Sequence, residues 1–175
     1  MALSLCERLD SRRTNQPARL AYIIDGVERD NKTSIDHVFR IANGLIAAGI
    51  GKGDRIAVLS RNSVECAEMM TGILCSGASM VPVPNTATPE AQRNMLLDSA
   101  VKGLFVSDQY RDAALQHFMD IPSIRADLRF ALETACEQFH DHTTWANTFD
   151  AGSPNVHMAL CLLYTSPSPR DVCSS

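Results

Sequence analysis

The sequence predicts an α/β fold with a mostly parallel sheet built from βαβ units. Short apolar segments alternate along the chain with amphipathic segments of roughly a dozen residues, the order typical of such units. One apolar segment, residues 56–59 (Ile-Ala-Val-Leu), has no polar residue on either face, and such strands are covered by helices on both sides. Right-handed crossovers between the strands are the expected topology.

The first residues predict a docking helix followed by a hairpin. Residues 1–13 carry apolar side chains at helical spacing, and residues 15–17 (Asn-Gln-Pro) end that segment. Residues 20–24 and 27–32 are predicted strands, because the Asp-Gly pair at 25–26 favours the positive φ angles of a tight turn. The apolar residues of the docking helix are Leu3, Leu5, Cys6 and Leu9.

A longer amphipathic helix follows, with Thr33 or Ser34 as its predicted cap and Gly49 at its end. A Gly-Lys-Gly-Asp turn at residues 51–54 then leads into the first parallel strand, residues 55–60. The apolar stripe of this helix is Ile35, Val38, Ile41, Ala42, Leu45 and Ala48.

The next helix and strand are predicted over residues 63–76 and 80–83. The core should then centre on Ile56, Val58 and Leu59, because helices must cover both faces of that strand. The neighbours expected around it are Leu45, Met70, Ile73 and Val81, and the full inward set of the helix is Val64, Ala67, Met70, Ile73 and Leu74.

Weaker patterns follow. Residues 88–90 (Thr-Pro-Glu) start a helix, since they supply a hydroxyl cap, a proline in the first turn and an acid near the positive end of the dipole. That helix should lead through Met95, Leu96 and Ala100 to a third strand. The third strand is predicted over residues 103–107, a further helix over 110–118, a polar connection over 121–150 and a linker over 151–154.

Composition limits the classes of function. Of 175 residues, 45% are hydrophobic and 21% charged, which suits one core or part of a larger one. A formal net charge of −4 disfavours nucleic-acid binding, because no basic face would neutralise a run of phosphates. No apolar run approaches the roughly 20 residues that span a bilayer, and the first residues turn charged too early for a signal peptide. We therefore expect a cytoplasmic protein without a transmembrane segment.

The cysteines and glycines do not form a recognisable cofactor motif. The 6 cysteines show no CxxC pair and no regular spacing, which argues against zinc fingers, redox dithiols and a secreted disulfide scaffold. Gly49, Gly51 and Gly53 lie between a helix and a strand, whereas the dinucleotide fingerprint lies between a strand and a helix. These glycines therefore predict a turn.

Candidate catalytic and ligand residues are few. Residues 140–142 (His-Asp-His), with His157, could form a metal cluster, but they lack a partner at ligand spacing and favour a surface loop. Residues 60–62 (Ser-Arg-Asn) follow the first parallel strand, where open α/β sheets bind ligands, although the position also favours capping of the next helix. Possible nucleophiles, none of them in a GxSxG motif or near an obvious histidine base, are Ser60, Ser63, Cys66 and Cys75.

Three motifs resemble a known enzyme family. GDRIAVLSRN at residues 53–62, SGASMVPVPN at 76–85 and TPE at 88–90 look like the N-terminal region of adenylate-forming acyl-CoA synthetases, the AMP-binding ligases. The resemblance covers residues 16–109 well and the rest loosely. It implies an acid–thiol ligase that activates a small carboxylic acid with ATP to an acyl-adenylate and transfers the acyl group to coenzyme A. Mg²⁺ would neutralise phosphate charge.

The same resemblance implies that this chain is an inactive fragment. The catalytic residues of the family lie mostly downstream of the motifs, so no catalytic residue and no metal ligand are expected here. Residues 1–160 would be an incomplete N-terminal subdomain with a truncated sheet. The alternative is a stand-alone flavodoxin-like binding or regulatory domain without catalysis. Neither the acid, the thiol acceptor nor the oligomeric state is indicated by the sequence.

Residues 161–175 are expected to be a non-native tail. Residues 161–171 (CLLYTSPSPRD) are what one reading frame of a common transposase sequencing adaptor encodes. Thr165 and Ser166, after Tyr164, nevertheless match the start of the family's phosphate loop, and we expect them to contact phosphate if that start is genuine. The residues after them include two prolines and no glycine, so the tail itself cannot form a phosphate cradle.

Overall fold

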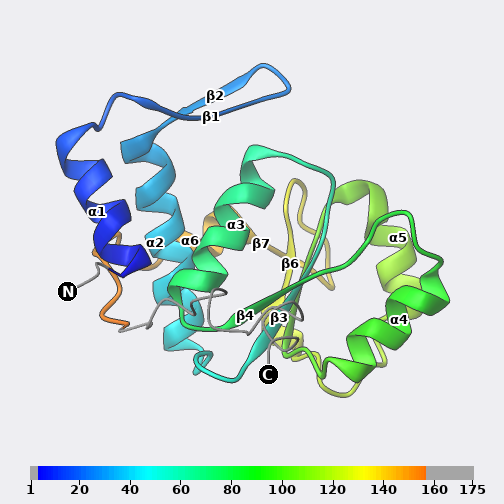
Figure 1. The fold of residues 1–175 in the computed structure, drawn as a ribbon. Coiled ribbons are helices and arrows are strands. Elements are labelled where there is room, and N and C mark those ends of the chain that lie inside the picture. The colour runs from blue at the N-terminus through cyan, green and yellow to red at the C-terminus, as the bar shows by residue number, and fades with distance from the viewer. Residues whose placement is uncertain (1–3, 157–175) are drawn as a thin grey trace, which may run out of the picture.

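The computed structural model describes residues 4–156 and has the predicted α/β architecture (Figure 1). Its strands are β1 (Leu20–Ile24), β2 (Val27–Asp30), β3 (Arg55–Leu59), β4 (Ser79–Pro82), β5 (Gly103–Val106), β6 (Arg129–Ala131) and β7 (His140–Asp141). Its helices are α1 (Leu5–Asn15), α2 (Asn31–Ala47), α3 (Val64–Cys75), α4 (Pro89–Asp98), α5 (Asp108–His117), α6 (His142–Ala146) and the 3-10 helix η1 (Ala126–Leu128). No helix within residues 4–156 is long and apolar enough to cross a membrane.

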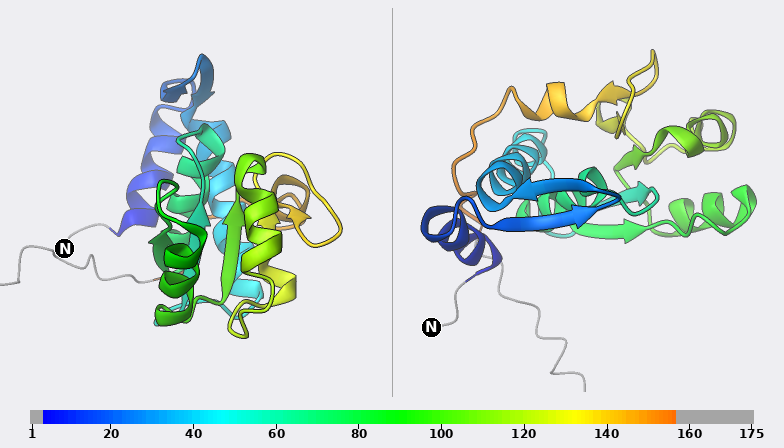
Figure 2. Two further views of the ribbon diagram at one scale, coloured as in Figure 1. Left: turned by 90° about the vertical axis from the view of Figure 1, so that its right-hand side faces the viewer. Right: turned by 90° about the horizontal axis from the view of Figure 1, so that it is seen from above.

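The sheet has five parallel strands in the order β4-β3-β5-β6-β7, and β1 and β2 form a separate antiparallel hairpin. Asp25 and Gly26 make the turn of this hairpin with φ angles of 52° and 78°, as the sequence predicts. Helices α2 and α3 cover one face of the sheet and α4 and α5 the other (Figure 2). The mostly parallel βαβ sheet is therefore confirmed.

Strand β3 lies inside the sheet and is buried on both faces. Ile56 and Val58 pack in the cluster that contains the α2 and α3 side chains. Ala57 and Leu59 pack in the opposite cluster, with side chains of α4 and α5. All four side chains are at most 4% exposed, so the prediction that helices cover this strand on both sides is confirmed.

Helices α2 and α3 approach each other closely at Gly72. A Cβ at this position would lie 2.6 Å from the Cγ2 atom of Ile41, so a larger residue would separate the helices. Leu45 and Ile73 are fully buried around β3, as predicted. Met70 is only partly buried, because Met69 takes the core position on α3. Val81, on β4, is also only partly buried and packs against the cluster on the opposite face of the sheet. Of the predicted inward set, Val64 and Ile73 are therefore buried, whereas Ala67, Met70 and Leu74 are only partly buried.

The cap of α2 differs from the sequence prediction. Asp30 caps the helix, and its carboxylate accepts hydrogen bonds from the backbone N–H of Thr33 at 2.8 Å and from the Thr33 hydroxyl at 2.9 Å. These bonds lower the pKa of Asp30. Thr33 and Ser34 therefore lie within the first turn of the helix. Several residues between Asp30 and Ser34 can cap a helix, so the sequence alone does not identify the first residue of α2.

The predicted polar connection over residues 121–150 is wrong. This segment contributes η1, β6, β7 and α6, and β6 adds Phe130 and Ala131 to the buried core. Strands β6 and β7 have only 3 and 2 residues, too few to show a period in the sequence. Of the three apolar residues expected on the helix after residue 88, only Leu96 is buried. Met95 of α4 is exposed, and Ala100, also exposed, lies beyond the end of α4.

Replacing Val58 with aspartate should unfold the chain or nearly so. The carboxylate would enter the apolar cluster beside Ile56 and Phe105 with no partner, at a cost of roughly 3–5 kcal/mol. Val27→Asp is the matched control, because Val27 is 47% exposed on the hairpin. Urea unfolding should show a large loss of free energy for the first variant and little change for the second. Equal effects would contradict the two-sided burial of β3.

Replacing Gly72 with alanine should destabilise the chain by about 1–3 kcal/mol, although alanine favours helices over glycine. The added methyl group would overlap Ile41 and force α2 away from α3. Gly51→Ala is the control, since its nearest neighbour would lie 4.0 Å from the new Cβ. An unchanged urea midpoint for Gly72→Ala would show that the two helices tolerate a wider spacing.

Candidate functional site

The strand order places a topological switch point between β3 and β5. The chain leaves β3 for β4 on one side and returns to β5 on the other, and open parallel sheets bind ligands at the carboxyl ends of such strands. Ser60 follows β3 and Ser107 follows β5, and their hydroxyl oxygens are 2.5 Å apart. The sequence pointed to Ser60 here, but only the sheet order brings Ser107 beside it.

The loops after β5 and β6 are tied together by a polar network. The backbone N–H of Asp108 donates to a carboxylate oxygen of Glu133 at 2.7 Å, and the N–H of Thr134 donates to Asp108 at 3.1 Å. Arg111 donates to Asp108 at 3.2 Å and to the carbonyl of Thr134 at 2.6 Å. These backbone donors already have carboxylate partners, so this part of the edge is a structural clamp.

Neither Arg61 nor Asn62 caps the next helix. Arg61 is exposed and pairs with Asp25 of the hairpin turn at 3.9 Å. The cap of α3 is Ser63, whose hydroxyl accepts a hydrogen bond from the N–H of Cys66 at 3.1 Å. Of the predicted Ser-Arg-Asn candidate, only Ser60 lies at the sheet edge.

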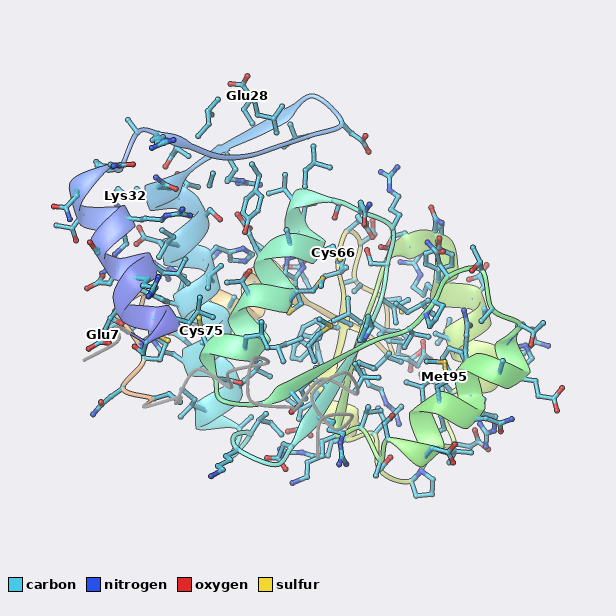
Figure 3. All side chains as sticks on the ribbon, in the orientation of Figure 1. Glu7, Glu28, Lys32, Cys66, Cys75 and Met95 are labelled. Carbon is cyan, nitrogen blue, oxygen red and sulfur yellow. The ribbon has the colours of Figure 1, made fainter. Side chains whose placement is uncertain are left out.

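The predicted nucleophiles are poorly placed for attack. The hydroxyl of Ser63 is engaged as the helix cap. Cys66, labelled on α3 in Figure 3, is 8% exposed, and burial raises the pKa of its thiol. Cys75 is 1% exposed, and its pKa is also raised, first by its contact with Cys6. Because both pKa values are raised, neither Cys66 nor Cys75 is an activated thiolate.

The histidine segment is not a surface loop. His140 and Asp141 form β7, and His142 starts α6 with 1% of its surface exposed. The Nδ1 atom of His142 lies 3.1 Å from the carbonyl oxygen of Ala131, and Thr143 contacts the other ring nitrogen. No three histidine, cysteine or acidic side chains within residues 4–156 are grouped to hold a metal ion. His157 lies outside these residues.

A charged cavity between α2, α3 and the hairpin was missed by the sequence analysis. Its volume is about 370 Å³, and Arg29, His37 and Glu68 lie on its wall. The Nδ1 atom of His37 is 2.7 Å from one carboxylate oxygen of Glu68, and the Nε atom of Arg29 is 3.7 Å from the other. The Glu68 side chain is only 2% exposed. The sequence feature that could have indicated this buried charge is the position of Glu68, four residues after Val64 on the apolar side of the helix.

The pKa of His142 gives this region a dependence on pH. Burial and the charge of His37 lower this pKa, since both penalise the imidazolium form. Below about pH 6.5 the unfolded chain therefore binds a proton at His142, whereas the folded chain keeps this imidazole neutral until a lower pH. Stability from this group is complete above the unfolded pKa and is lost as the pH falls toward the lower, folded pKa.

Urea unfolding between pH 8 and pH 5.5 should show this loss for the wild-type chain. His142→Asn keeps a donor for the carbonyl of Ala131 but cannot titrate, so its stability should fall less over the same interval. The comparison of the two slopes removes the contribution of the other histidines. Parallel slopes would show that His142 does not sense pH in the folded chain.

The remaining predicted site residues, Thr165 and Ser166, lie outside the described residues, so their contact with phosphate stays a prediction.

The resemblance to AMP-binding ligases is supported by comparison with known proteins. A sequence model of the family described as AMP-binding enzyme matches residues 10–168. This match is longer than the stretch that the motifs alone suggested.

Several curated relatives are similar to parts of the chain. The long-chain-fatty-acid–CoA ligase FadD15 of Mycobacterium bovis is 31% identical over 112 residues, which cover 62% of this chain and 19% of the relative. Surfactin synthase subunit 2 of Bacillus subtilis is 26% identical over 71% of this chain and 3% of its own length. Acetyl-coenzyme A synthetase of Pseudoalteromonas translucida is 28% identical over 76% of this chain and 24% of its own length. The chain thus spans a small part of each relative.

Solved structures give the same fold. The N-terminal domain of FACL13 from Mycobacterium tuberculosis superposes with a TM-score of 0.70 at 25% identity, over 90% of this chain and 39% of that one. A benzoate CoA ligase from Burkholderia xenovorans shares the fold alone, with a TM-score of 0.73 at 15% identity over 85% of this chain and 29% of that one. The sequence match over residues 10–168 and the shared fold together show that the chain belongs to the AMP-binding enzyme family.

Proposed function

We propose that this chain is the N-terminal part of an acid–thiol ligase that forms an acyl-adenylate and then a thioester. The observation that supports this most directly is the family match over residues 10–168, which runs through the whole described sheet. In the proposed reaction a carboxylate oxygen attacks the α-phosphorus of ATP and pyrophosphate leaves. The thiol of coenzyme A then attacks the acyl carbon and releases AMP.

The described residues do not themselves fit Mg²⁺ and the phosphates of ATP. The backbone N–H groups of Asp108 and Thr134, which face the carboxyl edge, already donate to carboxylates. Asp108 and Glu133 add negative charge at that edge, and negative charge repels a triphosphate. We therefore derive no catalytic step from residues 4–156. Thr165 and Ser166 are proposed as the first phosphate contacts of the loop that follows.

The role proposed for the described part is structural. A sheet covered on both faces gives a rigid wall, and the loops after its strands are held by the clamp at Asp108 and Arg111. A cytoplasmic location, where ATP and coenzyme A are present, belongs to the same proposal.

A fatty acid is the first substrate to test. Relatives named as fatty acid ligases include FadD15 and ScoC of Streptomyces coeruleorubidus, which is 38% identical over 71 residues. Aromatic acids come second, since the benzoate CoA ligase shares only the fold. The alternative hypothesis, a stand-alone flavodoxin-like binding or regulatory domain, predicts a natural stop near residue 160 and no pyrophosphate exchange from any extended gene product.

The gene, sequenced from genomic DNA, should continue past codon 160 into a loop rich in glycine and threonine, with Pro-Lys-Gly soon afterwards. The reason is the family match up to this point together with the likeness of residues 161–171 to an adaptor. Amplification across the locus checks this directly. Genomic DNA that encodes CLLYTSPSPRD followed by a stop after residue 175 would refute it.

The 175-residue chain should catalyse no carboxylate-dependent exchange of pyrophosphate into ATP, because residues 167–170 supply neither the glycines nor the lysine of a phosphate loop. The product of the complete gene should catalyse it with a fatty acid. Omitting the acid is the blank for both proteins. Exchange by the short chain would overturn the first expectation, and a folded full-length protein that is silent with fatty, aromatic and amino acids would overturn the proposed function.

A further inference from the structure

Two cysteines far apart in the sequence meet between α1 and α3. Cys6 is the second residue of α1 and Cys75 is the last residue of α3, at the end of the helix that approaches α1 (Figure 3). The thiol of Cys6 donates a hydrogen bond to the backbone carbonyl oxygen of Cys75 at 3.8 Å, and the side chain of Cys75 lies close enough to influence the Cys6 thiol. Both residues are at most 5% exposed, within the cluster that joins α1, α2 and α3.

Cys6 has the surroundings of a reactive thiol. The hydrogen bond from Cys75 lowers the pKa of Cys6, and a backbone hydrogen bond acts in the same direction, against the opposing effects of burial and of Glu7. The position in the first turn of α1 adds the positive end of a helix dipole, which favours a thiolate. Cys75 is the protonated partner, since its pKa is raised, chiefly by Cys6.

A cavity gives a small oxidant access to Cys6. Its volume is about 280 Å³, and it lies between the start of α1 and residues 153–156, with Cys6, Ser4 and Glu7 on its wall. Hydrogen peroxide is far smaller than this space. Cys66 offers a contrast within the same chain, because burial raises the pKa of its thiol, and its sulfur lies 3.7 Å from the Sδ atom of Met70 and not beside another thiol.

We propose that Cys6 and Cys75 are a redox-active dithiol that closes to a disulfide when a small peroxide reaches Cys6. The Cys6 thiolate attacks one peroxide oxygen, the O–O bond breaks and hydroxide leaves, which produces a sulfenic acid on Cys6. The sulfur of Cys75 then attacks the Cys6 sulfur, the S–O bond breaks, and the leaving hydroxide takes up the proton that Cys6 released when it became a thiolate. Two thiols lose two hydrogens in total, and one peroxide becomes two waters.

The second step becomes easier once the first has occurred. The raised pKa of Cys75 has its main cause in Cys6, and the sulfenic acid carries no negative charge. Cys75 can then lose its proton to the hydroxide released in the first step. Cys6 and Cys75 are 69 residues apart, so no CxxC motif marks them in the sequence as a dithiol pair.

The bond would tie α1 to α3 across α2. Its two cysteines enclose the whole hairpin, α2 and β3, and closing so long a loop restricts the unfolded chain strongly. Oxidation should therefore raise the melting temperature and fix the N-terminal helix on the core. This inference does not depend on the proposed ligase activity, since it concerns the helical layer and not the carboxyl edge.

The test is peptide mapping of the 175-residue chain after treatment with hydrogen peroxide. Glu-C protease cuts after Glu7, Glu65, Glu68 and Glu90, so Cys6 falls in peptide 1–7 and Cys75 in peptide 69–90, apart from Cys66. We expect these two peptides joined, with the loss of two hydrogen atoms, and separated again by dithiothreitol. Cys66→Ser should keep the linked pair, and Cys6→Ser should abolish it.

Thermal melting provides a second readout. Peroxide should raise the midpoint of the wild-type chain and of Cys66→Ser by several degrees, reversibly with dithiothreitol, and leave Cys6→Ser unchanged. Cys6 found joined to any other cysteine, or oxidised to sulfinic acid without a link to Cys75, would overturn the proposal. Because the mapping uses the wild-type chain, it decides the matter even if a variant fails to fold.

Discussion

Strand β3 has to be buried on both faces, and the other elements are arranged to satisfy that requirement. Its alternate side chains enter two separate apolar clusters, with Ile56 and Val58 in one and Ala57 and Leu59 in the other. Each cluster needs its own layer of helices, and the chain supplies α2 and α3 for one and α4 and α5 for the other (Figure 2). The pairing of β3 with both β4 and β5 follows, because an inner strand needs a partner on each edge.

That arrangement also determines where polar residues gather. With β4 and β5 on opposite edges of β3, the switch point falls between Ser60 and Ser107, and their hydroxyls pair with each other. The neighbouring loops use carboxylates of Asp108 and Glu133 to hold backbone N–H groups. A cradle for phosphate needs such N–H groups free and glycines around them. The backbone N–H groups of Asp108 and Thr134 at the described edge are therefore not free to bind phosphate.

The sequence predicted well where one pattern dominated, and poorly where several were possible. The apolar run at β3 and the stripe of α2 depend on burial, so their prediction succeeded for Val58 and Leu45. Strands β6 and β7 were not predicted, because they are too short to show an alternating pattern in the sequence. Their positions depend on pairing, β6 with β5 and β7 with β6. Ser107 beside Ser60, and Cys6 beside Cys75, are contacts between distant segments that no local pattern contains.

The layer of α1, α2 and α3 holds charges as well as thiols, and these charges are costly. Glu68 is buried, and its oxygens face His37 and Arg29, but Glu68 Oε1, Arg29 Nε and His37 Nε2 are among the buried atoms without a hydrogen bond. Removing His37 or Arg29 would leave the buried carboxylate with less compensating charge. The resulting loss of folding free energy is larger than the free energy that a surface ion pair contributes. The pairing therefore ties the hairpin to α2 and α3, because Arg29 reaches Glu68 and Glu65 of α3 from β2, and His37 reaches the Glu68 carboxylate from α2.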